Sequence, residues 1–421
     1  MASSPRSSWL CAQIGAREHY AIPRALHQAG KLAGLYTDFW AGPVLRKLLP
    51  ARGPLGSLKT RFHPDLVDAP VQAFRLRSLA WEARLRSQAR KEGGPYGGFC
   101  EVGRRFALAV AERLSRHDLP PDALFFAYDT GALEAFAALR PRGVRCVLNQ
   151  MDPNRVEVEL VREEEKRWPG WALRTTDVPE TYFRRREQEW ALADSVIVNS
   201  EFSRQALIRQ GLSSEKIVVI PLCYEADAGA AVREVRADVS TGRPLRILFL
   251  GQVILRKGIQ YLIEAARLLQ NEPVHFDVVG SIGISAEAVR SAPANVTFHG
   301  PVGRGQTEAW YRQSDLFVLP TLSDGFALTQ LEAMAYGLPV IATANCGDVV
   351  TNGVDGALIP THDAQALAAA ITGYVSDRNR LHTHQIQARQ KATQFSIARL
   401  QQNLAALQGR GPLSPASSFG N

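Results

Sequence analysis

The chain has 421 residues, of which 46% are hydrophobic and 21% charged; this composition excludes a disordered chain and fits a globular protein of two domains. No run approaches the ~18 consecutive apolar residues of a membrane-spanning helix, and the opening MASSPRSSWLCAQIG lacks an apolar signal core, so we expect a cytoplasmic protein. The formal charge of +8 favours anionic partners, but no zinc-finger, RNA-recognition or basic-zipper signature supports nucleic acid as that partner.

The first half alternates short apolar strands with amphipathic helices, which is typical of a parallel sheet covered on both faces. It is expected to open with a helix at 18–29 between two strands, and residues 41–100 form a long insertion rich in Arg, Gly and Pro. The strands expected in this half lie at or near 9–13, 33–37, 123–127, 144–149, 195–199 and 216–220.

The second half shows the same alternation more clearly. Strands are expected at 245–250, 274–280, 296–300, 316–320, 339–343 and 356–360. The sequence therefore predicts an α/β protein of two Rossmann-like domains, over 1–225 and 244–385, joined by a linker at 226–243 that lacks apolar periodicity. Residues 386–410 are expected to form a C-terminal helix that could pack back on the first domain, and residues 411–421 a disordered tail.

A pair of cations stands between the first strand and the first helix of the second domain. The strand ends at Gly251, and Arg256 and Lys257 precede Gly258, which opens the helix. Backbone N–H groups and the helix dipole add to the two side-chain charges there, so a phosphate would bind favourably. A solvated Arg–Lys pair on a surface turn is the alternative interpretation. The Gly-x-Gly-x-x-Gly spacing of a dinucleotide site is missing.

Two carboxylates follow the strand at 316–320. Asp324 lies in the loop at the carboxyl edge of the sheet, where open α/β sheets bind ligands, and Glu332 lies about two turns along the next helix. Such a pair suits hydrogen bonds to the hydroxyls of a hexose and a ribose. Alternatively, Asp324 caps the helix and Glu332 is solvated, but Glu332 has apolar neighbours, among which an unpaired carboxylate is costly.

The motifs GQVILRKG (251–258) and DGFALTQLEAMAYGLPVIAT (324–343) together resemble the donor half of glycosyltransferase family 4, the retaining group 1 enzymes of GT-B architecture. In that architecture two Rossmann-like domains face each other across a cleft. QIGAREHYAIPRALHQAG (13–30) is similar to the glycine loop and first helix of the family, and VNSEFSRQALIRQG (198–211) to the last segment of its N-terminal domain.

The resemblance implies a hexosyltransferase that moves a sugar from a nucleoside-diphosphate sugar to a hydroxyl of a glycan or lipid-linked acceptor, in polysaccharide or glycoconjugate synthesis. The departing β-phosphate would itself take the acceptor proton. Arg256 and Lys257 would neutralise the diphosphate and Asp324 would bind hexose hydroxyls, which makes these three the catalytic candidates. Glu332 would bind the ribose.

The remaining donor-binding positions follow from the same motifs. Backbone amides at the start of the helix would hold phosphate and sugar, the loop at 299–302 would border the base, and the N-terminal glycine turn would approach the diphosphate from the other domain. These positions are Gly15, Ala16, Gln252, His299, Gly300, Val302, Phe326, Ala327 and Leu328.

The chain departs from the family pattern at three places. Many relatives have Arg where Gln252 stands, and Asp324 replaces a Glu that is one methylene longer, which puts the identity of the donor in doubt. The family often has a His at the end of an N-domain strand; here Gln150 and Asp152 stand instead and are candidate acceptor residues, although Asp152 equally suits a turn before Pro153.

No acidic cage for a metal is recognisable, and the five cysteines form no Cys-x-x-Cys pair, so we expect no cofactor and metal-independent activity. The alternatives are a non-catalytic nucleotide-sugar-binding protein, or a nucleotide-sugar epimerase or phosphorylase of similar architecture. The basic segment at 73–91, with VLRKLLP (44–50) before it, could make peripheral contact with the inner face of a membrane; a solvated helix packed on the first domain is the favoured alternative.

Overall fold

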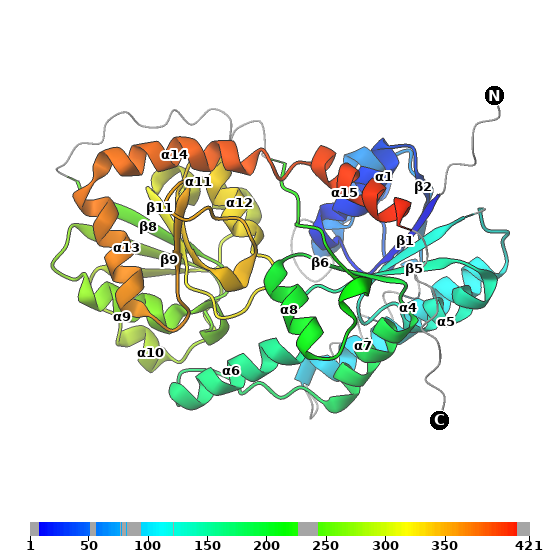
Figure 1. Cartoon of the computed structure of the whole chain (residues 1–421), viewed down its shortest axis with the longest axis horizontal. Coiled ribbons are helices and arrows are strands. Elements are labelled where there is room, and N and C mark those ends of the chain that lie inside the picture. Colours follow the sequence, from blue (N-terminus) through cyan, green and yellow to red (C-terminus); the bar gives the residue numbers. More distant parts are fainter. Residues whose placement is uncertain are drawn as a thin grey trace.

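The computed structural model describes residues 8–50, 56–75, 77, 81, 94–120, 122–225 and 243–410. They form two α/β lobes side by side, each with a wholly parallel sheet covered by helices on both faces (Figure 1). The prediction of two Rossmann-like domains is thereby confirmed. Most of the expected linker, the tail at 411–421 and most of the basic segment at 73–91 lie outside the described residues.

The N-terminal lobe contains a seven-stranded sheet in the order β3-β2-β1-β4-β5-β6-β7. Its strands are β1 (Trp9–Gln13), β2 (Leu32–Thr37), β3 (Val71–Ala73), β4 (Leu124–Tyr128), β5 (Arg145–Asn149), β6 (Ser195–Val198) and β7 (Ile217–Val219). The α-helices are α1 (Ala21–Gln28), α2 (Pro43–Leu48), α4 (Gly94–Ser115), α5 (Leu133–Leu139), α6 (Arg155–Arg167), α7 (Glu180–Leu192) and α8 (Glu201–Arg209). Short 3-10 turns are η1 (Arg17–Tyr20), η2 (Gly56–Thr60), η3 (Pro64–Leu66), η4 (Arg140–Arg142) and η5 (Ser214–Lys216).

Strand β1 shows why the strands of this sheet appear as continuous apolar runs in the sequence. Successive side chains point to opposite faces of a strand. Leu10 packs in the hydrophobic cluster that contains Phe106 of α4, whereas Cys11 packs in the cluster on the other face, which contains Ile22 of α1. Both faces are buried, so the first four positions of the strand are apolar or small, and its one polar residue, Gln13, stands at the carboxyl end.

The C-terminal lobe contains a six-stranded sheet in the order β10-β9-β8-β11-β12-β13. Its strands are β8 (Leu245–Leu250), β9 (Val274–Val279), β10 (Val296–Gly300), β11 (Leu316–Leu319), β12 (Val340–Thr343) and β13 (Gly356–Ile359). The helices are η7 (Leu255–Lys257), α9 (Ile259–Leu268), α10 (Ala286–Arg290), η8 (Arg304–Gln306), α11 (Thr307–Gln313), α12 (Leu328–Ala335), η9 (Ala344–Cys346) and α13 (Ala364–Ser376).

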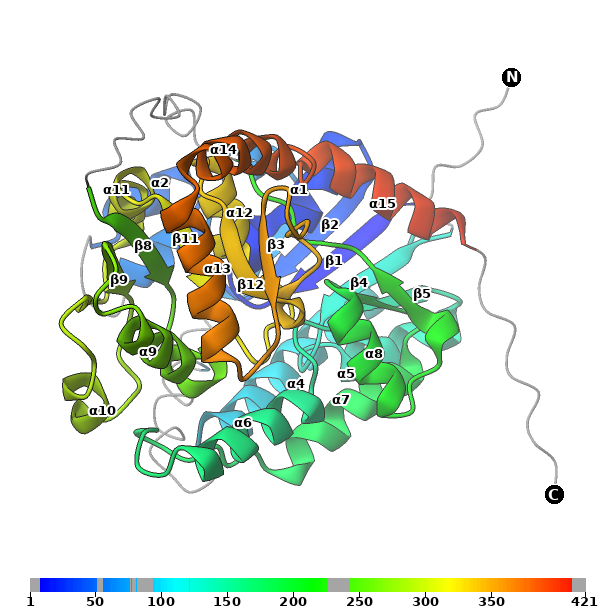
Figure 2. The same ribbon diagram turned by 60° about the vertical axis from the view of Figure 1, so that its left-hand side comes forward.

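The C-terminal end of the chain returns to the first lobe, which Figures 1 and 2 show along the top of the molecule. The single helix expected at 386–410 is wrong: there are two, α14 (Arg378–Ala392) and α15 (Ile397–Gly409). The second begins anew because the Ser396 side chain accepts a hydrogen bond from the Arg399 N–H and caps it. Helix α15 packs on α1, and Leu400 and Leu404 belong to the core of the N-terminal lobe.

Helix α6 joins the lobes on the opposite side, where it reaches from the N-terminal lobe beneath the C-terminal one (Figure 1). Glu164 on α6 is fully buried and accepts hydrogen bonds from Gln260 Nε2 (2.9 Å) and the Tyr261 hydroxyl (2.7 Å) of α9. The chain that follows α6 continues the contact, since the Ser285 N–H donates to the Trp171 carbonyl at 2.7 Å. The two lobes are therefore held together by polar contacts as well as by α15.

The strand predictions hold to within one or two residues. Two features of the first lobe, one strand and one helix start, differ from the expectation. The insertion at 41–100 contributes the edge strand β3, which is too short to show periodicity in the sequence. The helix expected at 18–29 begins only at Ala21, because Glu18, His19 and Tyr20 have positive φ angles of 49°, 54° and 60°. Such angles are uncommon outside glycine and asparagine and leave no mark in the sequence pattern. None of the described helices is both long and apolar enough to cross a bilayer.

Candidate functional site

The cationic turn of the C-terminal lobe is built around Gly258. This residue ends η7 and opens α9 with φ of +74°, and a Cβ atom here would overlap the Pro320 carbonyl group at the end of β11. Only glycine permits both this angle and this approach. The Arg256 carbonyl in turn accepts hydrogen bonds from the Leu322 N–H (2.9 Å) and the Thr321 hydroxyl (3.0 Å). The turn is thereby fixed against the carboxyl end of β11.

The three catalytic candidates lie together at this edge. Lys257 Nζ forms an ion pair with Asp324 Oδ2, and Arg256 Nη1 lies 3.7 Å from Asp324 Oδ1 while it donates to the Ser323 carbonyl at 2.8 Å. Burial raises the pKa of Asp324, but the charges of Lys257 and Arg256 outweigh burial, so its pKa lies below the ordinary value. All three side chains keep 14–21% of their surface exposed, so a ligand can reach them.

A fourth charged residue, Glu157, enters the site from the other lobe. Its Oε2 lies 3.3 Å from Arg256 Nη1 and accepts a hydrogen bond of 3.0 Å from the Ser323 hydroxyl. Burial, followed by the nearby carboxylates Asp152 and Asp324, raises the pKa of Glu157 to about 7 against the lowering effect of Arg256. No motif in the sequence indicates this residue, because nothing distinguishes it from the other glutamates of the charged helix α6.

The lobes touch directly beside this cluster. A Cβ atom on Gly325 would overlap the Met151 carbonyl oxygen, which follows β5 of the N-terminal lobe, and would crowd the Asn199 side chain. Nearby, Asp348 Oδ2 accepts a hydrogen bond of 2.9 Å from the Glu201 N–H at the start of α8. The loop that carries Asp324 is therefore closed against the opposite lobe.

A cavity of about 730 Å³ lies between the lobes, and residues of α12 form part of its wall. Glu332 lines it and accepts a hydrogen bond of 2.7 Å from the Tyr311 hydroxyl, so this carboxylate has a partner in its apolar surroundings. The N-terminal lobe contributes His19 and Arg24, and Leu328 lies in the wall next to Glu332. The cavity is large enough for a small-molecule ligand of nucleoside size.

The N-terminal glycine turn is anchored by its own polar network. Gly15 has φ of +84°, and its N–H donates to Asp38 Oδ1 at 2.8 Å. Asp38 also pairs with Arg61 at 3.3 Å, and a Cβ atom on Gly15 would overlap that guanidinium group. Ala16 follows the turn and is partly exposed, and Glu18 lines the interlobe cavity. Asp38 and Arg61 carry no motif signal, so the sequence did not indicate them.

Of the other predicted donor residues near α12 and in the loop after β8, only Leu328 is among the described residues that line the cavity. Phe326, in contrast, is buried and its ring packs against Phe395. The amide of Ala327, expected to hold phosphate or sugar, instead donates to the Cys346 carbonyl at 3.1 Å, which leaves the amides on either side of it for that role. The side chain of Gln252 is exposed.

The loop expected to border a base lies at the end of β10. His299 Nε2 is 2.7 Å from Asp277 Oδ1, and its ring packs on Trp310 with the centroids 4.3 Å apart. Gly300 accepts a backbone hydrogen bond from Gly280, and Val302 packs against the core. None of 299–302 is among the described residues that line the cavity.

The two candidate acceptor residues differ in their accessibility. Gln150 is fully buried, with its Oε1 accepting a hydrogen bond of 2.8 Å from Trp190, so its role is structural. Asp152 pairs with Arg186 at 2.9 Å but keeps 34% of its side chain exposed, on the same side as Glu157. Of the two, only Asp152 can contact a ligand.

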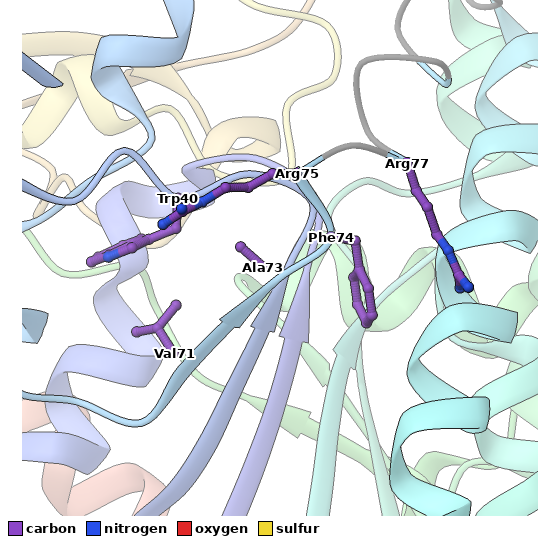
Figure 3. A pocket seen from close by; sticks show the side chains of 6 residues that line it. All are labelled: Trp40, Val71, Ala73, Phe74, Arg75 and Arg77. Carbon is purple, nitrogen blue, oxygen red and sulfur yellow. The ribbon is translucent and has the colours of Figure 1, made fainter. Parts of the chain in front are cut away.

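A separate cavity of about 410 Å³ lies at the outer edge of the N-terminal sheet, beside β3 (Figure 3). Its walls are largely apolar, with Trp40, Val71, Ala73 and Phe74 on β3 and the adjoining loops. In Figure 3 Arg77 points away toward α4, where it pairs with Glu112 at 3.1 Å. Trp40 also packs edge-on against Tyr20, the last residue of η1.

The two cations at the carboxyl edge of the C-terminal sheet suit a phosphate group, and the carboxylates Asp324 and Glu332 can accept hydrogen bonds from hydroxyl groups. Glu332 lines the 730 Å³ cavity, whereas Arg256, Lys257 and Asp324 are not among the described residues that line it. Within the described part of the chain, no three His, Cys, Asp or Glu side chains are grouped so that they could hold a metal ion.

Part of the chain is similar to known glycosyltransferases. Residues 244–377 match the family model described as glycosyl transferases group 1. A D-inositol 3-phosphate glycosyltransferase of Xylanimonas cellulosilytica is 32% identical over 234 residues, which are 50% of this chain and 55% of that protein. An amylovoran biosynthesis glycosyltransferase of Erwinia amylovora is 29% identical over 188 residues, 41% of this chain and 45% of that protein. The chain thus spans about half the length of the curated relatives it matches.

The fold comparison extends over both lobes. The crystal structure of the Anabaena protein HepE in complex with UDP and glucose superposes with a TM-score of 0.58 and 17% identity, over 95% of this chain and 99% of that one. At that identity the likeness concerns the fold alone. Residues 244–377 are therefore similar to group 1 glycosyltransferases, and the two lobes have the GT-B arrangement.

Proposed function

We propose that this protein is a retaining glycosyltransferase that moves a hexosyl group from a nucleoside-diphosphate sugar to a hydroxyl acceptor in polysaccharide or glycoconjugate synthesis. One observation carries the proposal: Arg256 and Lys257 meet Asp324 at the carboxyl edge of the C-terminal sheet, facing the other lobe. The similarity of 244–377 to group 1 glycosyltransferases supports it.

The ion pair between Lys257 and Asp324 suggests how the donor binds. The diphosphate of the donor replaces Asp324 as the partner of Lys257, and the freed carboxylate accepts hydrogen bonds from the hydroxyls of the sugar. Two cations then face the phosphate on which negative charge develops as the bond from C1 to its oxygen breaks. Such fixed charges are among the largest contributions to catalysis of group transfer.

The acceptor hydroxyl attacks C1 on the face that the phosphate leaves, which retains the configuration of the sugar. The hydroxyl proton passes to the departing β-phosphate oxygen, so no protein base is required. The task of the protein is then to position the reactants and to stabilise charge. Asp152, the accessible one of the two candidate acceptor residues, would orient the acceptor hydroxyl.

Glu332 and the adjoining cavity would hold the nucleoside. The hydrogen bond from Tyr311 fixes one carboxylate oxygen of Glu332, and the other can accept from a ribose hydroxyl. UDP bound to the Anabaena neighbour is consistent with a nucleotide in this fold, and we propose a nucleotide as the ligand of the 730 Å³ cavity here.

Metal independence is a further part of the proposal, since Arg256 and Lys257 supply the positive charge that a divalent cation provides elsewhere. Turnover is expected to survive exhaustive chelation. Loss of turnover on chelation, with recovery on addition of Mg²⁺ or Mn²⁺, would show this part to be wrong.

The acceptor is proposed to be a glycan or a lipid-linked glycan, the second of which would bring the enzyme to the inner face of a membrane. Helix α2 supports the second possibility, since Val44 and Leu48 are 76% and 77% exposed and lie next to the exposed cations Arg46 and Lys47. Flotation with anionic vesicles, compared with neutral ones, tests it. No flotation of wild type, or equal flotation of a Val44→Asp/Leu48→Asp variant, would exclude α2 as the contact.

The test of the whole proposal has two steps. Thermal-shift measurements with UDP-, GDP-, ADP- and dTDP-sugars identify the donor, because a ligand of the native state raises the melting temperature. Release of nucleoside diphosphate from that donor, and the anomeric configuration of the product by NMR, then establish transfer with retention. A non-catalytic binding protein would bind without release, and an epimerase would change the sugar without releasing the diphosphate. Either result would refute the proposal.

A further inference from the structure

Glu157 forms its hydrogen bond and its ion pair with residues of the opposite lobe. It lies on α6 of the N-terminal lobe, yet its hydrogen-bonding and ionic partners, Ser323 and Arg256, belong to the C-terminal lobe. Its side chain is 19% exposed, so it borders the site rather than the core. The contact brings a carboxylate to the cation that is proposed to bind the donor diphosphate.

Titratable and charged residues of both lobes surround Glu157. The turn η7 contributes Arg256, with Lys257 beside it, and the loop before α12 contributes Asp324. From its own lobe it faces Asp152, which is paired with Arg186 of α7, and Tyr96 of α4. Arg256 is thus shared between two carboxylates, Glu157 at 3.3 Å and Asp324 at 3.7 Å.

We propose that Glu157 is a positioning residue of the donor site: from the opposite lobe it holds the Arg256 guanidinium in place while the site is empty and releases it to the donor diphosphate. The inference rests on the proposed function and adds to it a residue that comes from the other lobe.

The exchange has an electrostatic consequence. A donor diphosphate carries two negative charges, and their arrival beside Glu157 favours the protonated form of this carboxyl group. Where Glu157 is ionised in the empty site, it therefore takes up a proton from solvent when the donor binds, and its neutral carboxyl group remains near Arg256 without competing for the charge.

The direction of the pH dependence follows from this linkage. In the empty site the pKa of Glu157 is about 7, because burial and the neighbouring carboxylates favour its neutral form. With this pKa, the fraction of the protein in which Glu157 is protonated before the donor binds falls from about nine tenths at pH 6 to about one tenth at pH 8. If the donor binds only to protein in which Glu157 is protonated, the apparent Kd of the donor rises about tenfold between pH 6 and pH 8.

The experiment measures the Kd of a nucleotide sugar by calorimetry between pH 6 and pH 8.5, using whichever of UDP-glucose, GDP-mannose and ADP-glucose binds most tightly. The diphosphate diesters of these probes do not titrate in this range. Wild type is expected to bind about tenfold more weakly at pH 8 than at pH 6, with proton uptake visible in buffers of different ionisation enthalpy. Glu157→Gln, which resembles the protonated form, is expected to vary less than twofold.

Glu159 provides the matched control, since it lies on the same helix and is exposed to solvent. Glu159→Gln is expected to keep the pH dependence of wild type, and Glu157→Asp, which retains a carboxylate, to keep part of it. The Asp variant also serves if the Gln variant fails to fold. A purely structural role for Glu157 would lower the melting temperature but leave the pH dependence of binding in place.

Two failures are distinguishable. A wild-type protein that binds donor with no pH dependence, or a Glu157→Gln variant whose dependence equals that of wild type, overturns the role of Glu157 alone. A protein that binds none of the nucleotide sugars overturns the proposed function, and the role of Glu157 with it.

Discussion

Lys257 and Asp324 are 67 positions apart in the chain and form an ion pair at the carboxyl edge of the C-terminal sheet. The pair joins the loop after β8 to the loop after β11, which are adjacent strands of one parallel sheet. Its two charges compensate each other, and in the proposed function a diphosphate that binds Lys257 frees Asp324 for a second partner. Several measurable properties depend on this arrangement.

Replacement of Lys257 by Ala is expected to reduce turnover at least ~100-fold, which is the scale of removing one group that stabilises charge in a transition state. The measurement is the steady-state release of nucleoside diphosphate from the donor. Melting temperature serves as the folding control, since Lys257 is partly exposed and its loss should not unfold the lobe. Turnover within a few-fold of wild type would exclude the proposed role.

Asp324→Asn is expected to change the affinity for the nucleotide sugar and the affinity for the free nucleoside diphosphate differently. It should weaken binding of the nucleotide sugar roughly tenfold or more, because hydrogen bonds to a charged group contribute about 1.5–3 kcal/mol. It should leave unchanged or strengthen binding of the nucleoside diphosphate without sugar, because Lys257 loses its competing partner. Calorimetric titration with both ligands checks this. Equal weakening of both would mean that Asp324 does not contact the sugar.

Gly258→Ala tests the construction of the cationic turn. The variant is expected to be destabilised by about 1–2 kcal/mol for the left-handed φ and by a further ~1–3 kcal/mol for the overlap with the Pro320 carbonyl. Gly353→Ala is the matched control, since Gly353 has nearly the same φ, +75°, but no neighbour within 4 Å of an added Cβ. Equal destabilisation of the two variants, measured by denaturant unfolding, would show that the close approach is unimportant.

Glu164→Ala tests the polar contact between the lobes. The side chain is fully buried, and its removal leaves the Tyr261 hydroxyl without this acceptor and Gln260 Nε2 with the Leu255 carbonyl alone, with an expected cost of about 2–4 kcal/mol. Glu163→Ala, an exposed neighbour on α6, is expected to change stability by no more than ~0.5 kcal/mol. Indistinguishable unfolding curves for the two variants would mean that α6 does not hold the lobes together.

Much of the fold was accessible from sequence because every strand of a doubly covered parallel sheet is an apolar run bounded by turns. Strands such as β8 and β10 lie where they were expected, to the residue. The exceptions were the three-residue strand β3 and the left-handed turn at 18–20, whose conformations depend on the surrounding packing and not on local preference, and the expected C-terminal helix, which divides into α14 and α15.

The sequence by itself determined that Arg256, Lys257 and Asp324 share one edge of a sheet, because all strands of a parallel sheet end their carboxyl termini on the same side. Only the tertiary structure decided what faces them. Glu157 and Gly325 acquire their partners when the lobes meet, through contacts between residues about 100 or more positions apart. No periodicity or motif encodes such a contact, because it is selected by the fit of two surfaces that form only after each lobe has folded.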